Sequence, residues 1–275
     1  MSDFLNYKTL DLETDRDWLT IWFNRPKVRN ALSGEMIEEL LHLFSALKGR
    51  PDIRGVTLRG RGGIFCAGGD IKEFKSLLQG ETKKLEDVAR ASRRNGELFD
   101  IINETPQVVI MLVEGAAMAG GMGIVCCGDV VVVTEDAKFA LTETSIGIPP
   151  AQIAPFVAAR LGSHVARRLM LTAGRFDGAE AVKIGLADYV AKDVDHMNGI
   201  EIDIKKRVRK CAAGANAVTK NIILATRYAG RTEMIDIAGE GFARCMLSDE
   251  GREGVASFLE KRKPYWAIRP TEKEA

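Results

Sequence analysis

The hydrophobic positions of this chain follow a strand period in some stretches and a helix period in others. Short alternating or continuous apolar runs predict strands, and apolar residues recurring every third or fourth position predict helices. Strands are predicted over 18–26, 53–60 and 107–113, with two shorter ones around a turn at Glu135 and Asp136 within 129–141. Helices are predicted over 30–49 and 83–105. Ser33 is placed to cap the first of these helices.

The order of these elements predicts a mixed α/β fold. The run QVVIMLV at 107–113 has no polar face, as expected of a strand that is covered on both sides. Strands alternate with helices up to about residue 150, and the rest of the chain reads as mainly helical. A repeated strand–strand–helix unit is consistent with this order, although its copies share little sequence similarity.

Two strand–loop–helix units carry the most informative small-residue loops. They are GVTLRGRGGIFCAGGDIKEF at 55–74 and VVIMLVEGAAMAGGMGIVCCGD at 108–129. Each runs an apolar strand into a loop that feeds a helix, and the first N–H groups of a helix have no partner within it. Such groups suit a developing oxyanion, and two loops can serve the same oxygen. The alternative is a pair of ordinary tight turns with small residues for close packing.

Glycines stand at the turn of each unit. Gly68 and Gly69 come directly before Asp70, which can cap the helix that follows. Gly120 and Gly121 open a very apolar helix. Glycine permits an unusual φ and lets a ligand approach the backbone closely. Neither loop has the GxxxxGK[ST] pattern of a P-loop or the GxGxxG pattern of a dinucleotide site.

Composition and charge narrow the class of protein. The chain has 275 residues, 46% hydrophobic and 28% charged, which is enough for a sizeable core. A formal net charge of +1 gives no global field for nucleic acid or an anionic membrane. The five cysteines show no CxxC spacing and read as reduced thiols. No apolar run approaches the roughly 18 residues of a membrane span, and the polar N-terminus does not resemble a targeting peptide, so a cytoplasmic protein is expected.

Five segments together resemble the crotonase (enoyl-CoA hydratase/isomerase) superfamily. In chain order they are NRPKVRNALSGEM, GGIFCAGGDIKEF, EGAAMAGGMGIVCCGDVVVVTEDAKFALTETSIGIPP, LTAGRFDGAEAVKIGLADYV and SDEGREGVASFLEKRKP. Each segment alone is a modest signal. Five in the correct order are specific, and the resemblance covers nearly the whole chain.

The resemblance implies a fold, an assembly and a substrate. The fold is an α/β crotonase-like ββα superhelix over 1–200, with a helical C-terminal region over 201–275 for oligomerisation and CoA contacts. The assembly is a homotrimer or a dimer of trimers. The substrate is an acyl-CoA thioester that brings its own coenzyme A, so no metal or separate cofactor is expected, and neither is a nucleic-acid or membrane partner.

The resemblance also implies a site. The N–H groups of Gly69 and Gly120 would hold the thioester oxygen and stabilise enolate charge on it. The implied substrate-binding residues are Arg29, Ala31, Ala67, Gly68, Gly69, Asp70, Ile71, Lys72, Gly120, Gln152 and Lys261. Lys261 would reach a CoA phosphate, in its own or a neighbouring subunit. For Lys72 and Lys261 the alternative is a simple solvated charge.

Glu143 is the carboxylate that the resemblance makes the catalytic acid and base. It follows an apolar strand and lies among small residues, a setting that can raise its pKa. Hydratases of the family commonly use two glutamates to position a water, and the first would stand three residues after Gly120, where this chain has Gly123. A single base instead fits Δ3,Δ2-enoyl-CoA isomerases, which move a proton between the α and γ carbons.

The segment IGIPPAQIAPFVAARLG at 146–162 favours hydration. It resembles the glutaconyl-CoA hydratase-like branch (isohexenylglutaconyl- and methylglutaconyl-CoA hydratases), which acts on branched, carboxylated enoyl-CoAs. Gln152 could hold a water or a substrate carboxylate, or it could cap a helix or face solvent. Glu114, close to the second loop, is expected to have a structural role.

Three functions remain open. The first is a lyase that hydrates a 2-enoyl-CoA, or dehydrates the product, through an enolate held by the two loops. The second is an enoyl-CoA isomerase with the same residues. The third is a non-catalytic crotonase-like binding protein. Some superfamily members bind RNA, and the basic stretch at 203–211 keeps that open, although a solvated helix face is expected there. His42, His164 and His196 are expected to be structural or surface residues.

Overall fold

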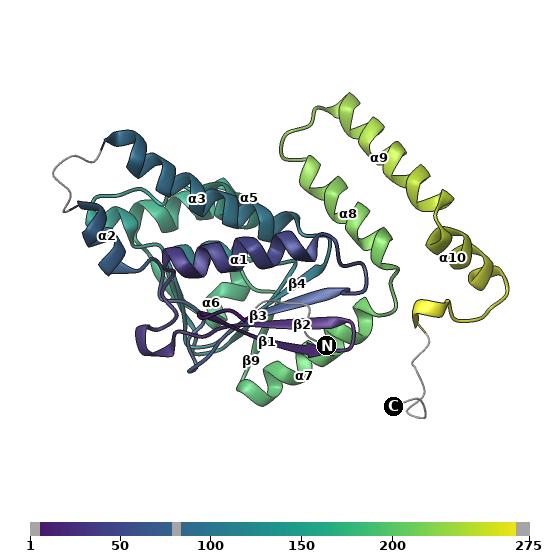
Figure 1. Ribbon diagram of the computed structural model, residues 1–275, viewed down its shortest axis with the longest axis horizontal. Coiled ribbons are helices and arrows are strands. Elements are labelled where there is room, and N and C mark those ends of the chain that lie inside the picture. Colours follow the sequence, from purple (N-terminus) through teal and green to yellow (C-terminus); the bar gives the residue numbers. More distant parts are fainter. Residues whose placement is uncertain (1–5, 79–83, 268–275) are drawn as a thin grey trace.

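A six-stranded sheet forms the centre of the molecule, in a computed structural model that describes residues 6–78 and 84–267 (Figure 1). The strand order is β1-β2-β3-β4-β6-β9. These strands are β1 (Leu10–Asp15), β2 (Trp18–Phe23), β3 (Gly55–Gly60), β4 (Val108–Val113), β6 (Val130–Thr134) and β9 (Tyr189–Ala191). β1 pairs with β2 antiparallel, and the remaining neighbours pair in parallel.

A smaller sheet lies beside the first and has the order β5-β7-β8. Its strands are β5 (Ala116–Met118), β7 (Lys138–Ala140) and β8 (Arg175–Asp177). The chain crosses from the larger sheet to the smaller one in β4–β5–α4 and in β6–β7, which a helix also follows. The strand–strand–helix repeat that the sequence suggested is therefore present, and β6 and β7 are the two short strands predicted around the turn at Glu135 and Asp136.

The helices follow the strands in chain order. They are α1 (Gly34–Leu47), α2 (Ile71–Leu78), α3 (Leu85–Glu104), α4 (Gly120–Cys126), α5 (Ala154–Thr172), α6 (Gly178–Lys183), α7 (Val194–Val208), α8 (Ala213–Ala225), α9 (Arg231–Leu247) and α10 (Asp249–Leu259), with 3-10 turns η1 (Pro26–Val28), η2 (Glu143–Ile146) and η3 (Tyr265–Ala267). The predicted cap is confirmed, because the Met36 N–H donates to Ser33 Oγ at 3.2 Å. None of the described helices is both long and apolar enough to cross a bilayer.

Both faces of the six-stranded sheet are covered, as the apolar run at 107–113 predicted. Val109, Met111 and Val113 of β4 join the large core that contains α1 and α3. Ile110 and Leu112 point the other way, into a second core with residues of α7. In Figure 1, α1 and α3 lie on one side of the sheet and α7 lies on the other. The sheet is therefore a rigid platform for the loops at its edge.

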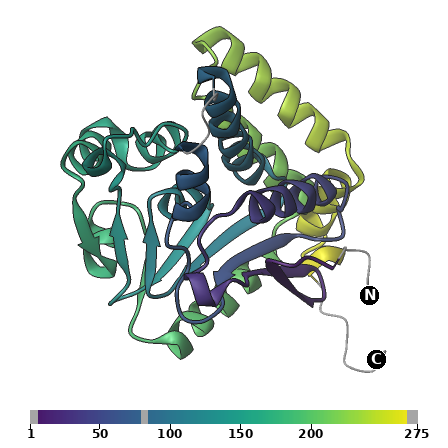
Figure 2. The same cartoon turned by 60° about the vertical axis from the view of Figure 1, so that its left-hand side comes forward.

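The C-terminal helices α8, α9 and α10 form an arm that stands away from the sheet (Figures 1 and 2). Few of its described residues are buried, whereas large apolar side chains such as Phe242 and Phe258 are 68% and 82% exposed. Lys220 anchors α8 to the core, because its ammonium donates to the carbonyl oxygens of Thr105 and Gln107 and pairs with Asp129. The predicted boundary at residue 200 lies inside α7, which packs on the sheet, so the arm itself starts after α7.

Candidate active site

The first loop, residues 61–70, leaves the backbone N–H of Gly69 without a partner among the described residues. The Leu32 N–H donates to Gly68 O at 2.8 Å, and the Asp70 N–H donates to Leu32 O at 2.9 Å. In this parallel pattern the residue between the two bonds, Gly69, directs its own N–H to the opposite side. No acceptor among the described residues receives that N–H. Gly68 has a φ of +96°, a backbone region that favours glycine.

The second loop, residues 114–121, leaves a similar donor. The Ala119 N–H donates to Ala140 O at 2.8 Å, and its φ of 49° and ψ of −120° turn the chain sharply into α4. Gly120 is the first residue of that helix, so its N–H has no partner within the helix. None of the described residues accepts it either. Both donors predicted from the sequence are therefore unpaired.

The two loops are in direct contact. The Cys66 N–H donates to Ala116 O at 3.0 Å, and the Met118 N–H donates to Cys66 O at 2.9 Å. A Cβ placed on Gly121 would lie 2.7 Å from Cys66 O, so only glycine fits there. The Cys66 thiol is buried, which raises its pKa to about 12 and keeps it from acting as a thiolate nucleophile. This arrangement can present two N–H donors to one ligand oxygen.

Glu143 begins η2, directly beyond β7, and is partly buried. Its Oε2 atom is buried and has no hydrogen-bond partner among the described residues. Burial raises the pKa of the carboxyl above its usual value of 4.5. η2 is fixed to α5, since Thr144 Oγ1 donates to Met170 O at 2.8 Å. A carboxyl whose pKa is raised in this way is suited to accept a proton and return it.

The position of the absent first carboxylate is filled by apolar side chains. A Cβ on Gly123 would lie 2.3 Å from Ile153 Cγ2 and 3.2 Å from Phe99 Cε1. Ile153 and Phe99 are both buried. The glycine thus lets Ile153 pack against α4, and this wall of the site is apolar.

Gln152, next to Ile153, is bound to α3. Its Nε2 donates to Ser92 Oγ at 3.1 Å, and its Oε1 lies only 2.5 Å from where a Cβ on Gly96 would be. Gln152 therefore neither caps a helix nor faces open solvent; it is partly buried against α3. Glu114 forms an ion pair with Arg59, which agrees with the structural role expected of it.

The other predicted binding residues divide into two groups. Ala67, Gly68, Gly69, Asp70, Ile71 and Lys72 lie together along the first loop and the exposed start of α2, beside Arg29 and Ala31. Lys261 follows α10, and α10 and α2 lie at opposite ends of the molecule in Figure 1. One chain therefore does not bring Lys261 to the loops. His42 bonds to Tyr7 Oη at 2.9 Å and His196 to the Lys192 N–H at 3.3 Å, as fits structural residues.

Two side chains that hold the first loop in place were not predicted from the sequence. Asn30 is fully buried, accepts from the Arg25 N–H and donates to the carbonyl oxygens of Arg61 and Ile64. Arg25 pairs with Asp70. Both lie in the NRPKVRNAL segment. The polar residues of that segment were the sequence feature that could have indicated them. Their partners in the first loop lie more than 30 residues further along the chain, so the sequence alone did not identify these contacts.

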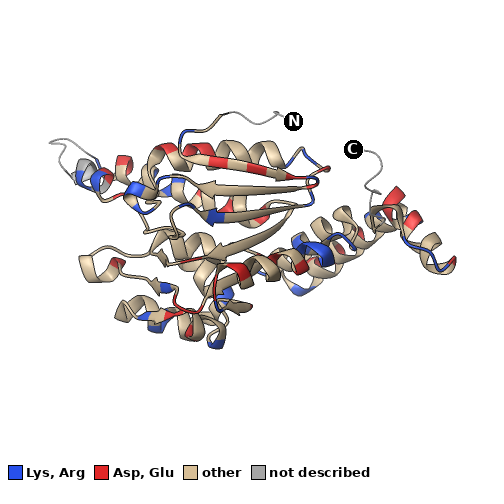
Figure 3. Cartoon of the chain, turned by 90° about the horizontal axis from the view of Figure 1, so that it is seen from below, with Lys and Arg blue, Asp and Glu red and all other residues tan. Residues whose placement is uncertain are grey.

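Acidic neighbours offset much of the positive charge of the basic stretch at 203–211. Lys205 pairs with Glu201 at 2.8 Å, and Lys206 pairs with Asp203 at 2.9 Å. Arg209, just after α7, pairs with Asp17. Acidic and basic residues are also interleaved over the fold (Figure 3).

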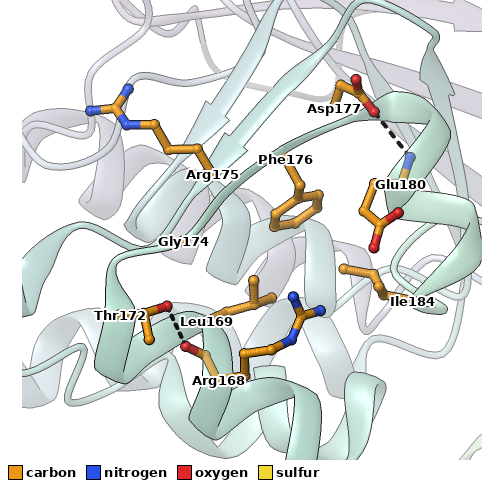
Figure 4. Close-up of a pocket in the computed structure, with 9 residues that line it drawn as sticks. All are labelled: Arg168, Leu169, Thr172, Gly174, Arg175, Phe176, Asp177, Glu180 and Ile184. Carbon is orange, nitrogen blue, oxygen red and sulfur yellow. Dashed lines mark hydrogen bonds between the residues drawn. The ribbon is translucent and has the colours of Figure 1, made fainter.

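A pocket of about 300 Å³ lies away from these loops, between the end of α5, β8 and α6 (Figure 4). Its charged lining residues include Arg168, Arg175, Asp177 and Glu180. Asp177 accepts the Glu180 N–H as a helix cap, and Thr172 donates to Arg168 O. None of the residues predicted from the sequence lines it, so it is separate from the candidate site.

Known proteins share this architecture. The family profile described as Enoyl-CoA hydratase/isomerase matches residues 13–269. The solved structure of AtuE from Pseudomonas aeruginosa is 41% identical and superposes with a TM-score of 0.91, covering 95% of this chain and 100% of that one. This structural match confirms the fold that the sequence implied.

Two curated relatives carry different reactions in their names. A short-chain-enoyl-CoA hydratase of Clostridium acetobutylicum is 27% identical over 254 residues, 92% of this chain and 95% of that protein. A peroxisomal Delta(3,5)-Delta(2,4)-dienoyl-CoA isomerase of Arabidopsis thaliana is 27% identical over 275 residues, 95% of this chain and 98% of that protein. Identity to these two relatives therefore does not separate hydration from isomerisation.

Proposed function

This chain belongs to the enoyl-CoA hydratase/isomerase family of the crotonase superfamily and processes acyl-CoA, and we propose that its reaction is the syn hydration of a 2-enoyl-CoA or the reverse dehydration. The observation that carries the proposal is Glu143, a partly buried carboxyl with a raised pKa and an unpartnered Oε2. It is supported by two adjacent loops, each with an unpaired backbone donor.

In the proposed reaction, the thioester oxygen accepts hydrogen bonds from the Gly69 and Gly120 N–H groups. Ionised Glu143 takes a proton from a water while the water oxygen bonds to C3 and the double-bond electrons move onto the thioester oxygen as an enolate. Glu143 then returns that proton to C2, and the carbonyl reforms. One carboxyl serves as base and then as acid, so the hydrogen and the hydroxyl enter on the same face. Loss of one oxyanion donor typically costs about 10²–10³ in rate.

A Δ3,Δ2-enoyl-CoA isomerase is the second candidate, and one observation favours it. Ile153 and Phe99 fill the place of the absent first carboxylate, which leaves an apolar wall where hydratases hold their water. Glu143 would then remove a proton from C2 of a 3-enoyl-CoA and deliver it to C4. The same two N–H groups would stabilise the enolate.

For the acyl group we propose a branched, carboxylated chain of the glutaconyl type. The support is the 146–162 segment and Gln152, a partly buried amide next to the apolar wall. A change of Gln152 to Leu should weaken selection for a carboxylated over a plain enoyl-CoA. Equal selection by the variant and the parent protein would contradict this assignment.

We propose a homotrimer or dimer of trimers in the cytoplasm, with no cofactor beyond the coenzyme A of the substrate. The exposed apolar side chains of α9 and α10 support an assembly, because a lone chain would leave them in water. Lys261 would then serve a neighbouring subunit's CoA.

Incubation with 2-enoyl-CoA and with 3-enoyl-CoA separates the candidate functions. Hydration removes the absorbance of the conjugated 2-enoyl thioester, whereas isomerisation of the 3-enoyl form creates it. Glu143→Gln should lower either turnover by about 10²–10⁴ while acyl-CoA binding is retained. Glu135→Gln, which alters an exposed turn glutamate, is the matched control. Binding without turnover in the parent protein would favour the non-catalytic scaffold, and unaltered turnover in Glu143→Gln would reject the catalytic assignment.

A further inference from the structure

Backbone hydrogen bonds hold the first loop against residues 25–34, which we call the template segment. The Ala67 N–H donates to Arg29 O at 3.0 Å, and Leu32 bonds both to Gly68 O and to the Asp70 N–H. Further on, the Gly34 N–H donates to the Glu73 carboxylate at 2.8 and 3.0 Å. The direction of the Gly69 N–H is therefore fixed by a segment more than 30 residues earlier in the chain.

An ion pair between Arg25 and Asp70 adds a side-chain link between the template segment and the first loop. Arg25 Nη2 donates to Asp70 Oδ2 at 3.0 Å, while Arg25 Nη1 donates to Ala31 O. The other carboxylate oxygen of Asp70 accepts the Lys72 N–H at 3.1 Å. The two side chains are only 23% and 12% exposed. A planar guanidinium thus ties the template to the residue that directly follows Gly69.

We propose that Arg25 and Asp70 are positioning residues, whose ion pair sets the aim of the Gly69 N–H on the thioester oxygen. This inference rests on the proposed function and adds to it the side chains that hold the donor. Gly68 and Gly69 have no Cβ, so the peptide between them can rotate with little steric penalty. Leu32 restrains that peptide from one side, and Asp70 restrains it from the other. A displacement of about 1 Å in such a group can cost about 10² in rate.

The simpler explanation is that Asp70 only caps α2. Asparagine is about as good an N-cap as aspartate, so Asp70→Asn keeps the cap and removes the ion pair. If capping were its whole role, this variant would behave like the parent protein. Arg25→Lys keeps the positive charge but cannot bind Ala31 O and the Asp70 carboxylate with a rigid fork.

Asp188 offers a control with the same kinds of partner. Its Oδ2 atom accepts one backbone N–H, from Val131 at 2.7 Å, and one arginine, Arg160 Nη2 at 3.0 Å. Asp188 directly precedes β9, outside both loops, and Arg160 belongs to α5. Asp188→Asn therefore removes a carboxylate charge beside an arginine, as Asp70→Asn does, without touching the donor.

The test measures kcat and KM of Asp70→Asn, Arg25→Lys and Asp188→Asn on the enoyl-CoA that the parent protein turns over. The first two should lose about 10- to 100-fold in kcat with a small change in KM. Asp188→Asn should stay within about twofold of the parent kcat. Equal losses in Asp70→Asn and Asp188→Asn would overturn the proposal. So would a rise in KM alone, which would make Asp70 a substrate contact.

Two readouts do not need turnover and keep this proposal separate from the proposed function. Bound dienoyl-CoA, whose absorbance shifts to longer wavelength when its carbonyl is polarised, should show a smaller shift in Asp70→Asn than in Asp188→Asn. Amide hydrogen exchange of the 66–72 segment in the free protein should rise in Asp70→Asn and in Arg25→Lys, and should not rise in Asp188→Asn. A parent protein without turnover would contradict the proposed function. An unchanged exchange rate in Asp70→Asn would contradict the positioning role whether or not the enzyme turns over.

Discussion

The two loops end in the same feature, an unpaired glycine N–H, but different interactions hold them. The first depends on polar side chains, since Asn30 and the pair of Arg25 and Asp70 bind it to the template segment. The second depends on packing, since Gly121 lies against Cys66 and α4 is buried from Gly121 to its end at Cys126. The first loop should therefore be sensitive to lost charges and hydrogen bonds, and the second to added volume.

Added volume in the second loop should have the largest effect. In Gly121→Val, the new Cβ would lie 2.7 Å from Cys66 O and 2.8 Å from Cys66 Cβ, so the backbone of both loops must shift. We expect a loss of about 1–3 kcal/mol in unfolding free energy, with turnover largely abolished. Denaturant titration and initial rates measure the two effects.

Gly239→Ala is the control for that substitution. Gly239 lies in α9, and a Cβ there would meet no atom within 4 Å. This variant should be as stable as the parent protein or slightly more so, because alanine favours a helix. If Gly121→Val were equally harmless, the second loop would not depend on packing.

Removal of hydrogen bonds from the first loop should have the next largest effect. Asn30→Ala leaves the carbonyl oxygens of Arg61 and Ile64 and the N–H of Arg25 without their side-chain partner. We expect a loss of about 1–3 kcal/mol in unfolding free energy and a lower kcat. Circular dichroism during denaturation and steady-state kinetics give both values.

Part of that loss in unfolding free energy comes from the backbone, because position 30 has a φ of +55°, which asparagine adopts more readily than alanine does. Asn30→Gly removes the backbone strain that alanine would have at this positive φ, but it does not restore the missing hydrogen bonds. It should recover some stability over Asn30→Ala and remain below the parent protein. A fully stable Asn30→Gly would show that the side chain contributes no stability to the loop.

The pH dependence should be the smallest effect and concerns Glu143, outside both loops. Burial raises its pKa above 4.5, so the folded state holds this proton more tightly than the unfolded state does. Its contribution to stability is therefore present at low pH and is lost as pH rises through the folded-state pKa. The melting temperature of Glu143→Gln relative to the parent protein should increase over that window.

The same window should contain the acid limb of the parent protein's kcat/KM, since the ionised form starts the reaction. This limb should lie above pH 4.5 and should move or vanish on substitution of Glu143. A stability difference that stays constant from about pH 4 to pH 8 would contradict the raised pKa.

The periodic parts of the fold could be predicted from the sequence. β2, β3, β4 and both short strands within 129–141 were found, because buried strands impose apolar runs. β1 was missed, since this edge strand carries Asp11 and Glu13 on its exposed positions and reads as polar. The mainly helical region predicted after about residue 150 starts with α5, in which Gly162, with a φ of +72°, marks a kink.

The site was predictable where it rests on local chain geometry. The two glycine loops follow from a turn before a helix, and the resemblance to the crotonase superfamily implied Gly69 and Gly120 as the donors. Their lack of acceptors among the described residues agrees with that assignment. The contacts between distant segments were not predictable. Nothing in AMAGGMG indicates that Ile153 occupies the space beside Gly123, and nothing in NRP indicates that Arg25 reaches Asp70. Such contacts depend on packing that one sequence does not encode in a local pattern.

The most direct test of the central claim is a crystal structure of Glu143→Gln with a bound 2-enoyl-CoA. The account predicts that the thioester oxygen lies about 2.7–3.1 Å from both the Gly69 N and the Gly120 N atoms, with the side chain at position 143 facing C2 of the substrate. A thioester oxygen bound to other groups, or to only one of these two N–H donors, would contradict it.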